Sequence, residues 1–311
     1  MPEVTIQPER VLKDLRELWV QLGNEQEDAG GVLRACAMTL VVIVESDAEA
    51  QLVRQTLGVL MHDHPSRAIV LRAIEGAPLE ARVFAECWMP FGRNQQICSE
   101  GIEMTADATN LGEVAHLLIP LLVPDLPVVM WCHGGRFFGS RYFDPLFPIA
   151  QKIIVDSRGA ANGKGAIAVL KEFRSRGTRV ADLAWTRLTG WREALAHSCE
   201  ESLRTSTAAR IEYGGPLSSS VLYFTRWIER ASPSTVVTLA PVPGDAGLRS
   251  VTFSGGTQGI SVKLADAGSL EVQASGCTSR SMLPAAGEDA LMREELSILG
   301  PDPVFEGVLK G

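Results

Sequence analysis

The sequence predicts a mixed α/β fold of two domains, each a mixed sheet covered by helices. In the first half, helical spacing of apolar residues alternates with short β-branched runs, the order expected of a sheet covered by helices. In the second half, short strand-like runs separated by Gly-rich turns are typical of a meander. A Gly- and Ala-rich stretch at residues 157–165 lies between the two patterns. We therefore predict an N-terminal α/β domain at residues 1–157 and a C-terminal α/β domain with the meander at residues 158–311.

The N-terminal domain is expected to begin with an amphipathic helix at residues 11–22, which ends at Gly23. The β-branched run within residues 34–45 is too short for a helix and predicts a buried strand. Ser46 is the expected N-cap of the second helix, and Asn110 that of the third. The complete order is helix 11–22, strand 34–45, helix 47–61, strands 66–73, 79–88 and 95–105, helix 111–122, and strands 127–131 and 152–156.

The C-terminal domain is expected to open with helices and to continue with the meander. A final helix is expected to cover one face of a sheet. The predicted order is helices 166–175 and 180–203, strand 208–213, helix 218–231, strands 235–240, 248–253, 260–264 and 270–274, and helix 288–299.

Composition and charge exclude several classes of protein. The chain has 311 residues, of which 46% are hydrophobic and 21% charged, a balance typical of a folded globular protein. Its formal net charge of −8 repels phosphate backbones and anionic lipids, which argues against nucleic-acid or membrane partners. No basic segment leads into an apolar leader core, and the apolar runs at residues 38–44 and 117–123 are far shorter than the ~20 residues of a membrane helix. We expect a cytoplasmic protein.

The chain has six cysteines, and their spacing includes no Cys-x-x-Cys pair. Several fall in strand-like apolar segments, where a thiol behaves as a small hydrophobe. Cys199 lies beside two glutamates, which raise the pKa of a thiol. We therefore predict reduced core residues without a redox role at Cys36, Cys87, Cys98, Cys132, Cys199 and Cys277.

Three motifs resemble functional sites without completing one. The loop at residues 159–165 is one residue shorter than a Walker A loop and has Gly165 where a magnesium-binding Ser or Thr belongs. His62 and His64 have no third metal ligand at a zinc-like spacing. Cys132 and His133 are adjacent in the chain, and the sequence has no nucleophile elbow. We predict no catalytic, cofactor-binding or metal-binding residue.

The segment at residues 182–192 is a candidate contact surface. Its Trp185 and Trp191 fall at helical spacing on one face, and Arg187 lies on another side. Trp and Arg are the residues that most often dominate protein interfaces, so Trp185, Arg187, Trp191 and Arg192 are candidate partner contacts. A helix that packs its tryptophans into the core and leaves its arginines in solvent explains the same pattern.

The same segment carries a family resemblance. Asp-Leu-Ala-Trp-Thr-Arg-Leu-x-x-Trp-Arg strongly resembles the OpcA family, the glucose-6-phosphate dehydrogenase assembly proteins. Further matching stretches are Arg-Ala-Cys-Ala-Met-Thr-Leu at residues 34–40, His-Pro-Ser-Arg-Ala at 64–68, Gln-Ile-Cys-Ser-Glu at 96–100, Leu-Ile-Pro-Leu-Leu-Val-Pro-Asp-Leu-Pro at 118–127 and Val-Asp-Ser at 155–157. The resemblance extends over most of the chain.

What the resemblance implies is a non-enzymatic partner that binds glucose-6-phosphate dehydrogenase, promotes its active oligomer and raises its activity in the oxidative pentose phosphate pathway. It also implies an N-terminal α/β domain followed by a C-terminal domain. In cyanobacterial members the activation is tied to cysteine redox state. Because no close cysteine pair is visible in this sequence, we do not extend redox control to it.

Two other functions remain open on the sequence. A sugar-phosphate-binding enzyme would use Ser66, Arg67 and Arg72 near the Gly-rich loop, with Asp156 or His64 as its base. A metabolite sensor would bind without turnover. The candidate anion-binding residues are Ser66, Arg67, Gly163 and Lys164. Turnover of sugar phosphates without the dehydrogenase would favour the enzyme.

Overall fold

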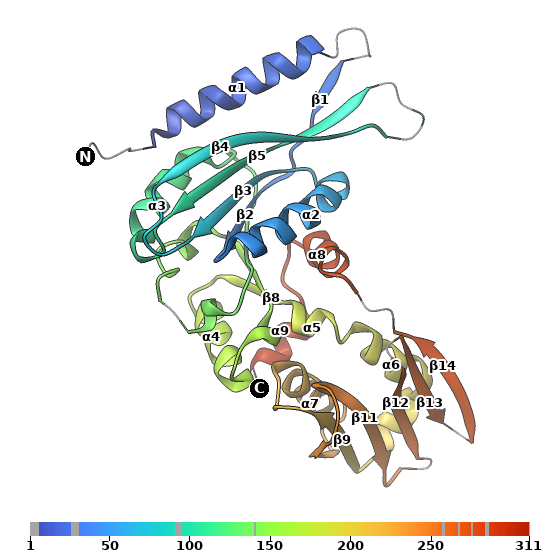
Figure 1. Ribbon diagram of the computed structural model, residues 1–311. Helices are drawn as coiled ribbons and strands as arrows, with labels where there is room; N and C mark the ends of the chain where they lie inside the picture. The colour runs from blue at the N-terminus through green and yellow to red at the C-terminus, as the bar shows by residue number, and fades with distance from the viewer. Residues whose placement is uncertain are drawn as a thin grey trace. The chain divides into compact units, whose positions relative to one another are not determined.

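The computed structural model describes residues 6–25, 31–90, 92, 95–139, 141–256, 259–266, 268–274, 276–283 and 286–310, with the side chains of 25, 136 and 198–204 left out. The chain forms two compact units (Figure 1). Unit 1 consists of residues 1–156, 177–180 and 292–299. Unit 2 consists of residues 157–176, 181–291 and 300–311. The predicted α/β class is confirmed, because each unit contains helices and a sheet.

Unit 1 is built on an eight-stranded sheet with the order β1-β5-β3-β2-β6-β7-β8, and β4 pairs with β5. β4 runs antiparallel to β5, whereas β1–β5, β3–β5, β2–β3, β2–β6 and β6–β7 are parallel. The strands are β1(Val32–Arg34), β2(Met38–Val44), β3(Ser66–Ala73), β4(Glu80–Trp88), β5(Gln96–Ala106), β6(Val128–Cys132), β7(Lys152–Val155) and β8(Arg179–Asp182). After β2 the chain adds β3 and β5 on one side of β2, and later β6, β7 and β8 on the other side. The sheet is therefore doubly wound, with its switch point between β2 and β6.

The helices of unit 1 cover both faces of this sheet. All seven residues of β2 are buried, as expected of a strand with packing on both sides. α2 contacts β2, β3 and β4, whereas α1 contacts β4 and η3. The helices and short 3-10 turns are α1(Pro8–Glu25), α2(Asp47–Asp63), η2(Ala108–Asn110), α3(Leu111–Leu118), η3(Ile119–Leu121), η4(Arg136–Phe138), η5(Phe147–Ile149) and the second half of α8(Glu288–Ser297).

Unit 2 is built on a six-stranded sheet with the order β10-β9-β11-β12-β13-β14. β10 is parallel to β9, and the remaining pairs are antiparallel, which gives the expected meander. α6 contacts β12 and β13, and α7 contacts β10 and β11. The elements are η6(Ser157–Gly159), α4(Gly163–Ser175), α5(Leu183–Thr186), α6(Thr189–Thr205), β9(Ala208–Gly214), α7(Ser219–Ala231), β10(Val236–Val242), β11(Gly247–Ser254), β12(Ile260–Asp266), β13(Ser269–Ala274), β14(Cys277–Met282) and α9(Pro303–Lys310).

Several predicted elements need correction. The strand predicted at residues 34–45 is two strands, β1 and β2, which pair with different neighbours. The helix predicted at 180–203 is a strand followed by two helices, because Asp182 is extended and its carboxylate caps a new helix at Ala184. β14 and α9 were not predicted. β14 is an edge strand whose residues are mostly exposed, so it lacks the apolar alternation that marks a half-buried strand.

No helix within the described ranges is both long and apolar enough to cross a membrane. In the same ranges, no three or more His, Cys, Asp or Glu side chains come together in a way that could hold a metal ion.

Candidate functional site

The segment at residues 182–192 joins the end of β8 to the start of α6 in unit 2, and Asp182 is its anchor. The Asp182 side chain is fully buried, and it accepts hydrogen bonds from the Ser157 N–H at 3.0 Å, the Ala184 N–H at 2.9 Å and the Tyr223 hydroxyl at 2.8 Å. The Ser157 hydroxyl also donates to it. These bonds fasten η6, α5 and α7 to one carboxylate.

The electrostatics of this cluster follow from its burial. Burial raises the pKa of Asp182 to about 6, although the hydrogen bonds from Ser157, Ala184 and Tyr223 oppose the change. The pKa of Tyr223 is raised as well, by burial first and then by the Asp182 charge. A carboxylate among hydroxyls resembles catalytic machinery, but Asp182, Tyr223 and Ser157 are at most 1% exposed and no substrate reaches them. The cluster is therefore scaffolding that holds the segment in place.

The two tryptophans of the segment are core residues. Trp185 is buried, donates from Nε1 to Asp302 at 3.0 Å and stacks on Phe305 with ring centroids 5.5 Å apart. Trp191 is buried beside Phe224, with ring centroids 5.9 Å apart. Both rings fill the interior of unit 2, which agrees, for the tryptophans, with the alternative of a helix that packs them into the core.

The arginines of the segment lie differently from its tryptophans. Arg187 and Arg192 are half-buried. The Arg192 guanidinium lies over the Trp185 ring, and its Nη2 donates to the Thr189 hydroxyl at 2.9 Å. The contact role predicted for this segment thus rests on Arg187 and Arg192.

In unit 1, two buried glutamates lie on opposite faces of β5. Glu100 is fully buried and accepts hydrogen bonds from Trp19 Nε1 at 2.7 Å, Arg34 Nη2 at 2.6 Å and Arg67 Nε at 2.6 Å. Burial alone would raise the pKa of Glu100, but the Trp19 donor and the two guanidiniums lower it below its usual value. Glu103, three residues further, faces α2 and binds a second set of arginines.

The predicted anion-binding residues belong to two different units. Ser66 and Arg67 are buried in unit 1, where Arg67 pairs with Glu100 and donates from Nη1 to the Leu121 carbonyl at 2.7 Å. Those contacts engage the guanidinium and disfavour an anion there. Gly163 and Lys164 belong to unit 2, at the start of α4.

Close packing explains the glycine at the start of α4. A Cβ on Gly163 would lie 2.5 Å from the Ser219 nitrogen, so glycine permits the approach of α7. Asn162 caps α4 by accepting from the Gly165 N–H at 3.2 Å, and Lys164 is exposed. The loop at 159–165 is a helix start, as its incomplete phosphate-loop pattern predicts.

The predicted bases of the rival enzyme lie at the surface of unit 1. Asp156 is half-buried just after β7, and His64 is the C-cap residue of α2. His62 stacks on Trp88 with ring centroids 4.8 Å apart. Neither histidine lies in a group of metal-ligating side chains among the described residues.

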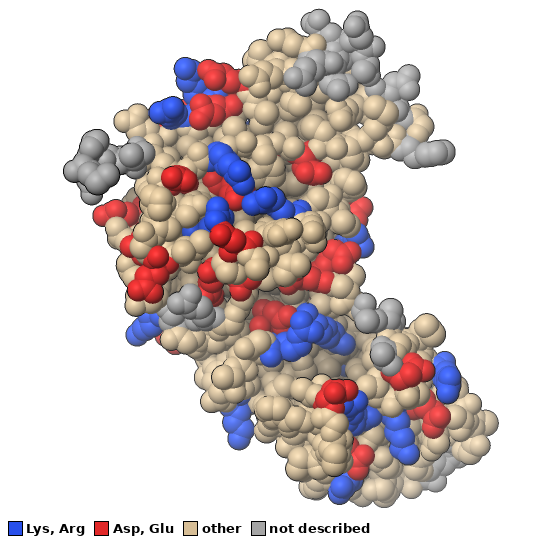
Figure 2. Space-filling view, in the orientation of Figure 1, with Lys and Arg blue, Asp and Glu red and all other residues tan. Residues whose placement is uncertain are grey.

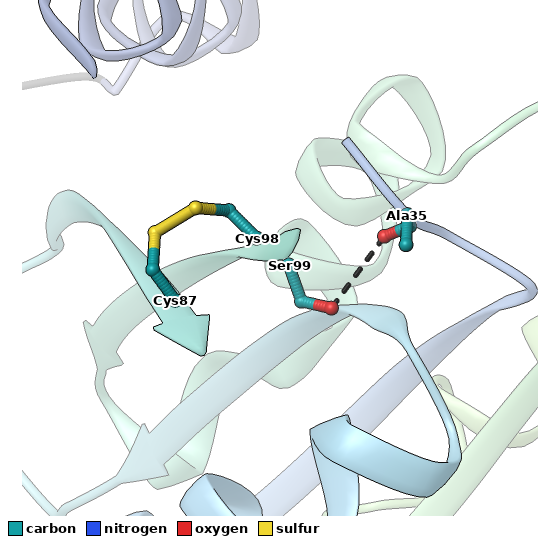
Figure 3. The surroundings of a disulfide bond; sticks show 4 residues. All are labelled: Ala35, Cys87, Cys98 and Ser99. Carbon is teal, nitrogen blue, oxygen red and sulfur yellow. Dashed lines mark hydrogen bonds between the residues drawn. A yellow bond between two sulfur atoms is a disulfide. The ribbon is translucent and has the colours of Figure 1, made fainter. Parts of the chain in front are cut away.

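The prediction of reduced core cysteines is wrong at one pair, which is oxidised, and at Cys277, which is exposed on the edge strand β14. Cys87 and Cys98 form a disulfide (Figure 3). They are directly opposite each other on the antiparallel strands β4 and β5, with Cα atoms 4.1 Å apart. Sequence spacing conceals this pair because ten residues separate the two cysteines along the hairpin.

Cys36, Cys132 and Cys277 are free thiols, and the Cys199 side chain lies outside the described residues. Burial raises the pKa of Cys132, with a further contribution from Glu45, as expected of a core thiol. Burial also raises the pKa of the half-buried Cys36.

The switch point of the unit 1 sheet is occupied by carboxylates, a feature that sequence motifs did not reveal. Ligands of doubly wound sheets bind there, beyond the carboxyl ends of the strands. The Glu49 carboxylate accepts the Glu45 N–H at 2.7 Å at the start of α2. Gly134, with φ of 102°, follows β6, and a Cβ there would lie 3.0 Å from Glu49 Oε1. Acidic side chains thus lie beside the carboxyl end of β6, where doubly wound sheets bind ligands.

Comparisons with known proteins identify relatives over most of the chain. Residues 58–172 match the family model described as glucose-6-phosphate dehydrogenase subunit N-terminal domain, and residues 178–309 match the corresponding C-terminal domain. The putative OxPP cycle protein OpcA of Synechocystis sp. is 24% identical over 75% of this chain and 50% of its own length. The protein of the same name from Nostoc punctiforme is 24% identical over 61% of this chain and 43% of its own.

The chain thus spans about half the length of the curated relatives it matches. The fold is similar to a solved structure of KijD10, a 3-ketoreductase from Actinomadura kijaniata. The match covers 88% of this chain and 94% of the KijD10 chain at 8% identity, with a TM-score of 0.49. The two family models match residues 58–172 and 178–309, the second of which includes the segment anchored by Asp182, and the chain belongs to the OpcA family.

Proposed function

We propose that this chain is a non-catalytic assembly factor and allosteric activator of glucose-6-phosphate dehydrogenase in the oxidative pentose phosphate pathway. The observation that carries the proposal is the match of both units to models described as dehydrogenase subunit domains. The curated relatives are named as OxPP cycle proteins, which agrees with the same pathway.

The geometry supports a binding role over a catalytic one. The most catalytic-looking cluster, around Asp182, is closed to solvent. The sheet edge where doubly wound enzymes hold a dinucleotide is filled by Glu45 and Glu49, which repel phosphates. An activator acts by binding the active state of its partner more tightly than the inactive state, which needs a surface and no reactive group.

The direct experiment is a titration of this protein into its cognate glucose-6-phosphate dehydrogenase. We expect a saturable fall in the KM for glucose 6-phosphate or a rise in kcat, together with a shift of the dehydrogenase to a larger species in sedimentation. An equal amount of an unrelated acidic protein is the control for crowding and charge. Unchanged kinetics and an unchanged sedimentation profile at saturation would contradict the proposal.

The rival enzyme hypothesis is tested in the same preparation. Sugar phosphates are incubated with this protein alone, and products are followed by mass spectrometry. We expect no turnover. Product formation without the dehydrogenase would favour the enzyme.

A further inference from the structure

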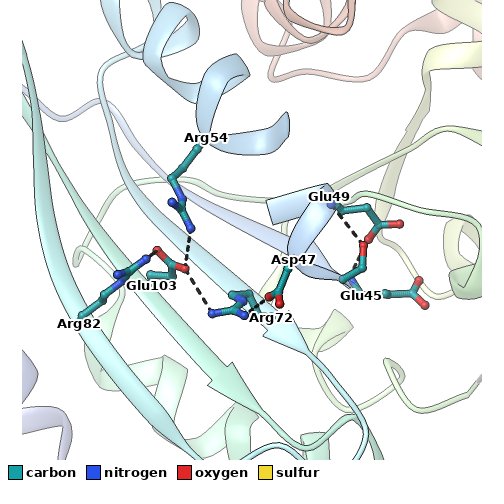
Figure 4. Close-up of polar contacts among 8 residues, drawn as sticks. Glu45, Asp47, Glu49, Arg54, Arg72, Arg82 and Glu103 are labelled. Carbon is teal, nitrogen blue, oxygen red and sulfur yellow. Dashed lines mark hydrogen bonds and ion pairs between the residues drawn. The ribbon is translucent and has the colours of Figure 1, made fainter. Parts of the chain in front are cut away.

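A small polar pocket lies on the α2 side of the unit 1 sheet. Its volume is about 170 Å³, and it is lined by Arg72, Glu80, Ala81, Arg82, Glu103 and Thr105. These residues come from β3, β4 and β5, near the carboxyl ends of β3 and β5. Figure 4 shows Arg54 and Asp47 of α2 reaching toward the same place.

The sheet register explains why these side chains meet. Thr105 on β5 lies opposite Arg72 on β3 and Glu80 on β4. In the next row on the same face, Glu103 lies opposite Arg82. Two arginines and a hydroxyl are therefore held by three paired strands, a rigid base for a binding site.

Three guanidiniums meet at the one buried carboxylate of this pocket. Glu103 is 5% exposed and binds Arg54 Nη2 at 3.0 Å and Arg82 at 2.6 and 3.0 Å, while Arg72 Nη1 lies 3.6 Å away. These three guanidiniums thus share one buried carboxylate, and the exposed carboxylates of Asp47 and Glu80 lie beside them. On the face drawn in Figure 2, basic side chains lie interspersed with acidic ones and form no broad field.

The remaining partners of Arg72 can be replaced. Its Nη2 pairs with Asp47, which is 77% exposed and therefore contributes little as a surface ion pair. Its buried Nε has no hydrogen-bond acceptor among the described residues. An oxyanion in the pocket would satisfy that N–H and could take Nε and an Nη together, the two-pronged geometry that guanidiniums form with phosphate.

We propose that this pocket binds the dianionic phosphate group of a small phosphate monoester. Arg72 and Arg82 supply the charge, and the Thr105 hydroxyl supplies a further donor. Glu103 is a positioning residue that holds the arginines in place. The proposal goes beyond the assembly function and does not depend on it.

The test is binding to the full chain without the dehydrogenase, by calorimetry at low ionic strength. The probes are inorganic phosphate and a hexose 6-phosphate, and the unphosphorylated hexose is the control. We expect phosphate-dependent binding that weakens as pH falls and the dianion takes up a proton. Tighter binding of the ester than of phosphate identifies the ester as the ligand, whereas equal binding identifies phosphate itself. If neither probe binds at a concentration of about 10 mM, the proposal is wrong.

Variants locate the site. Arg72→Gln and Arg82→Gln are each expected to weaken binding about tenfold or more, since each removes a charged donor. The matched control is Arg141→Gln, which removes the same charge from an arginine that is 81% exposed and pairs with Asp144. Circular dichroism checks folding, and the more exposed Arg82 keeps the test valid if Arg72→Gln does not fold. Equal affinity of Arg82→Gln and wild type would place the anion elsewhere and overturn the proposal.

Discussion

The guanidinium carbon of Arg192 lies 3.8 Å from the centroid of the Trp185 ring. The same indole donates to Asp302, so its edge and one face are both engaged by charged groups inside unit 2. A cation over a buried indole is less screened than one at an open surface and contributes more to folding. Arg192 thus has a structural role that its sequence position did not reveal.

We therefore expect Arg192→Ala to lower the free energy of unfolding by about 1–2 kcal/mol, because it removes the cation and the packing of its stem on the indole. Arg192→Lys should retain part of that energy. Urea denaturation followed by tryptophan fluorescence measures both. Arg210→Ala, at an exposed arginine that pairs only locally with Glu212, is the matched control. If Arg192→Ala and the control have the same stability, the contact contributes nothing.

Asp182 predicts a specific pH dependence. Its pKa is about 6 in the folded protein and near 3.8 when unfolded, so between these values the folded state holds more protons. Ionisation of Asp182 therefore lowers the free energy of unfolding as pH rises from about 4 to 6, and protonation restores it as pH falls. When the pH is lowered from 7 to 5, the free energy of unfolding of wild type should rise by about 1 kcal/mol relative to that of Asp182→Asn. Thermal unfolding of both proteins at the two pH values measures this, and an unchanged difference would show that Asp182 does not titrate there.

The strongly patterned parts of the fold were predictable from sequence. Buried β-branched runs such as residues 38–44 identify the parallel strands, and Ser46 is the N-cap of α2, as predicted. The break at Asp182 was not predictable from periodicity, because Leu183 to Trp191 keep apolar residues at near-helical spacing across the short helix α5 and the start of α6. There a buried carboxylate decides the backbone conformation through contacts from distant residues.

The candidate sites were less accessible to sequence reasoning. Arg72, Arg82 and Glu103 are far apart in the chain and meet only through strand register. Cys87 and Cys98 meet for the same reason. Arg67 was predicted to hold an anion, but its partner is the buried Glu100 from a neighbouring strand. A hairpin prediction at residues 79–105, combined with register counting, is the one sequence signal that could have found the cysteine pair.

The Cys87–Cys98 bond should stabilise unit 1. Closing a loop of this length removes about 2–3 kcal/mol of chain entropy from the unfolded state. We expect dithiothreitol to lower the melting temperature of wild type and to leave that of Cys87→Ala/Cys98→Ala unchanged. Thiol alkylation under denaturing conditions, with and without reductant, counts the free cysteines. Six reactive thiols before reduction would show that the bond is absent in solution.

Glu100 is expected to be the costliest single charge to remove from unit 1. Glu100→Gln leaves Arg67 buried without its carboxylate and should lower the unfolding free energy by about 3 kcal/mol or more at pH 7. Because the pKa of Glu100 is lowered on folding, this contribution is present above about pH 4 and is lost as pH falls through the folded value. A double variant with Arg67→Met should recover part of the loss. If the double variant is no more stable than the single one, the two charges are not coupled.

Arg187 is the sharpest probe of the proposed partner contact at residues 182–192. Trp185 and Trp191 are buried, so their removal would disrupt the core and reveal nothing about binding. Arg192 is bound to Trp185, so its loss mixes stability with binding. We expect Arg187→Ala to weaken binding to glucose-6-phosphate dehydrogenase by roughly 2 kcal/mol, about thirtyfold, if the half-buried arginine is a dominant contact. Calorimetric titration measures the affinity, and Arg210→Ala is again the control. A folded Arg187→Ala protein that binds and activates as wild type does would contradict the proposed contact role of Arg187 and leave Arg192 as the one partly exposed candidate among the four residues.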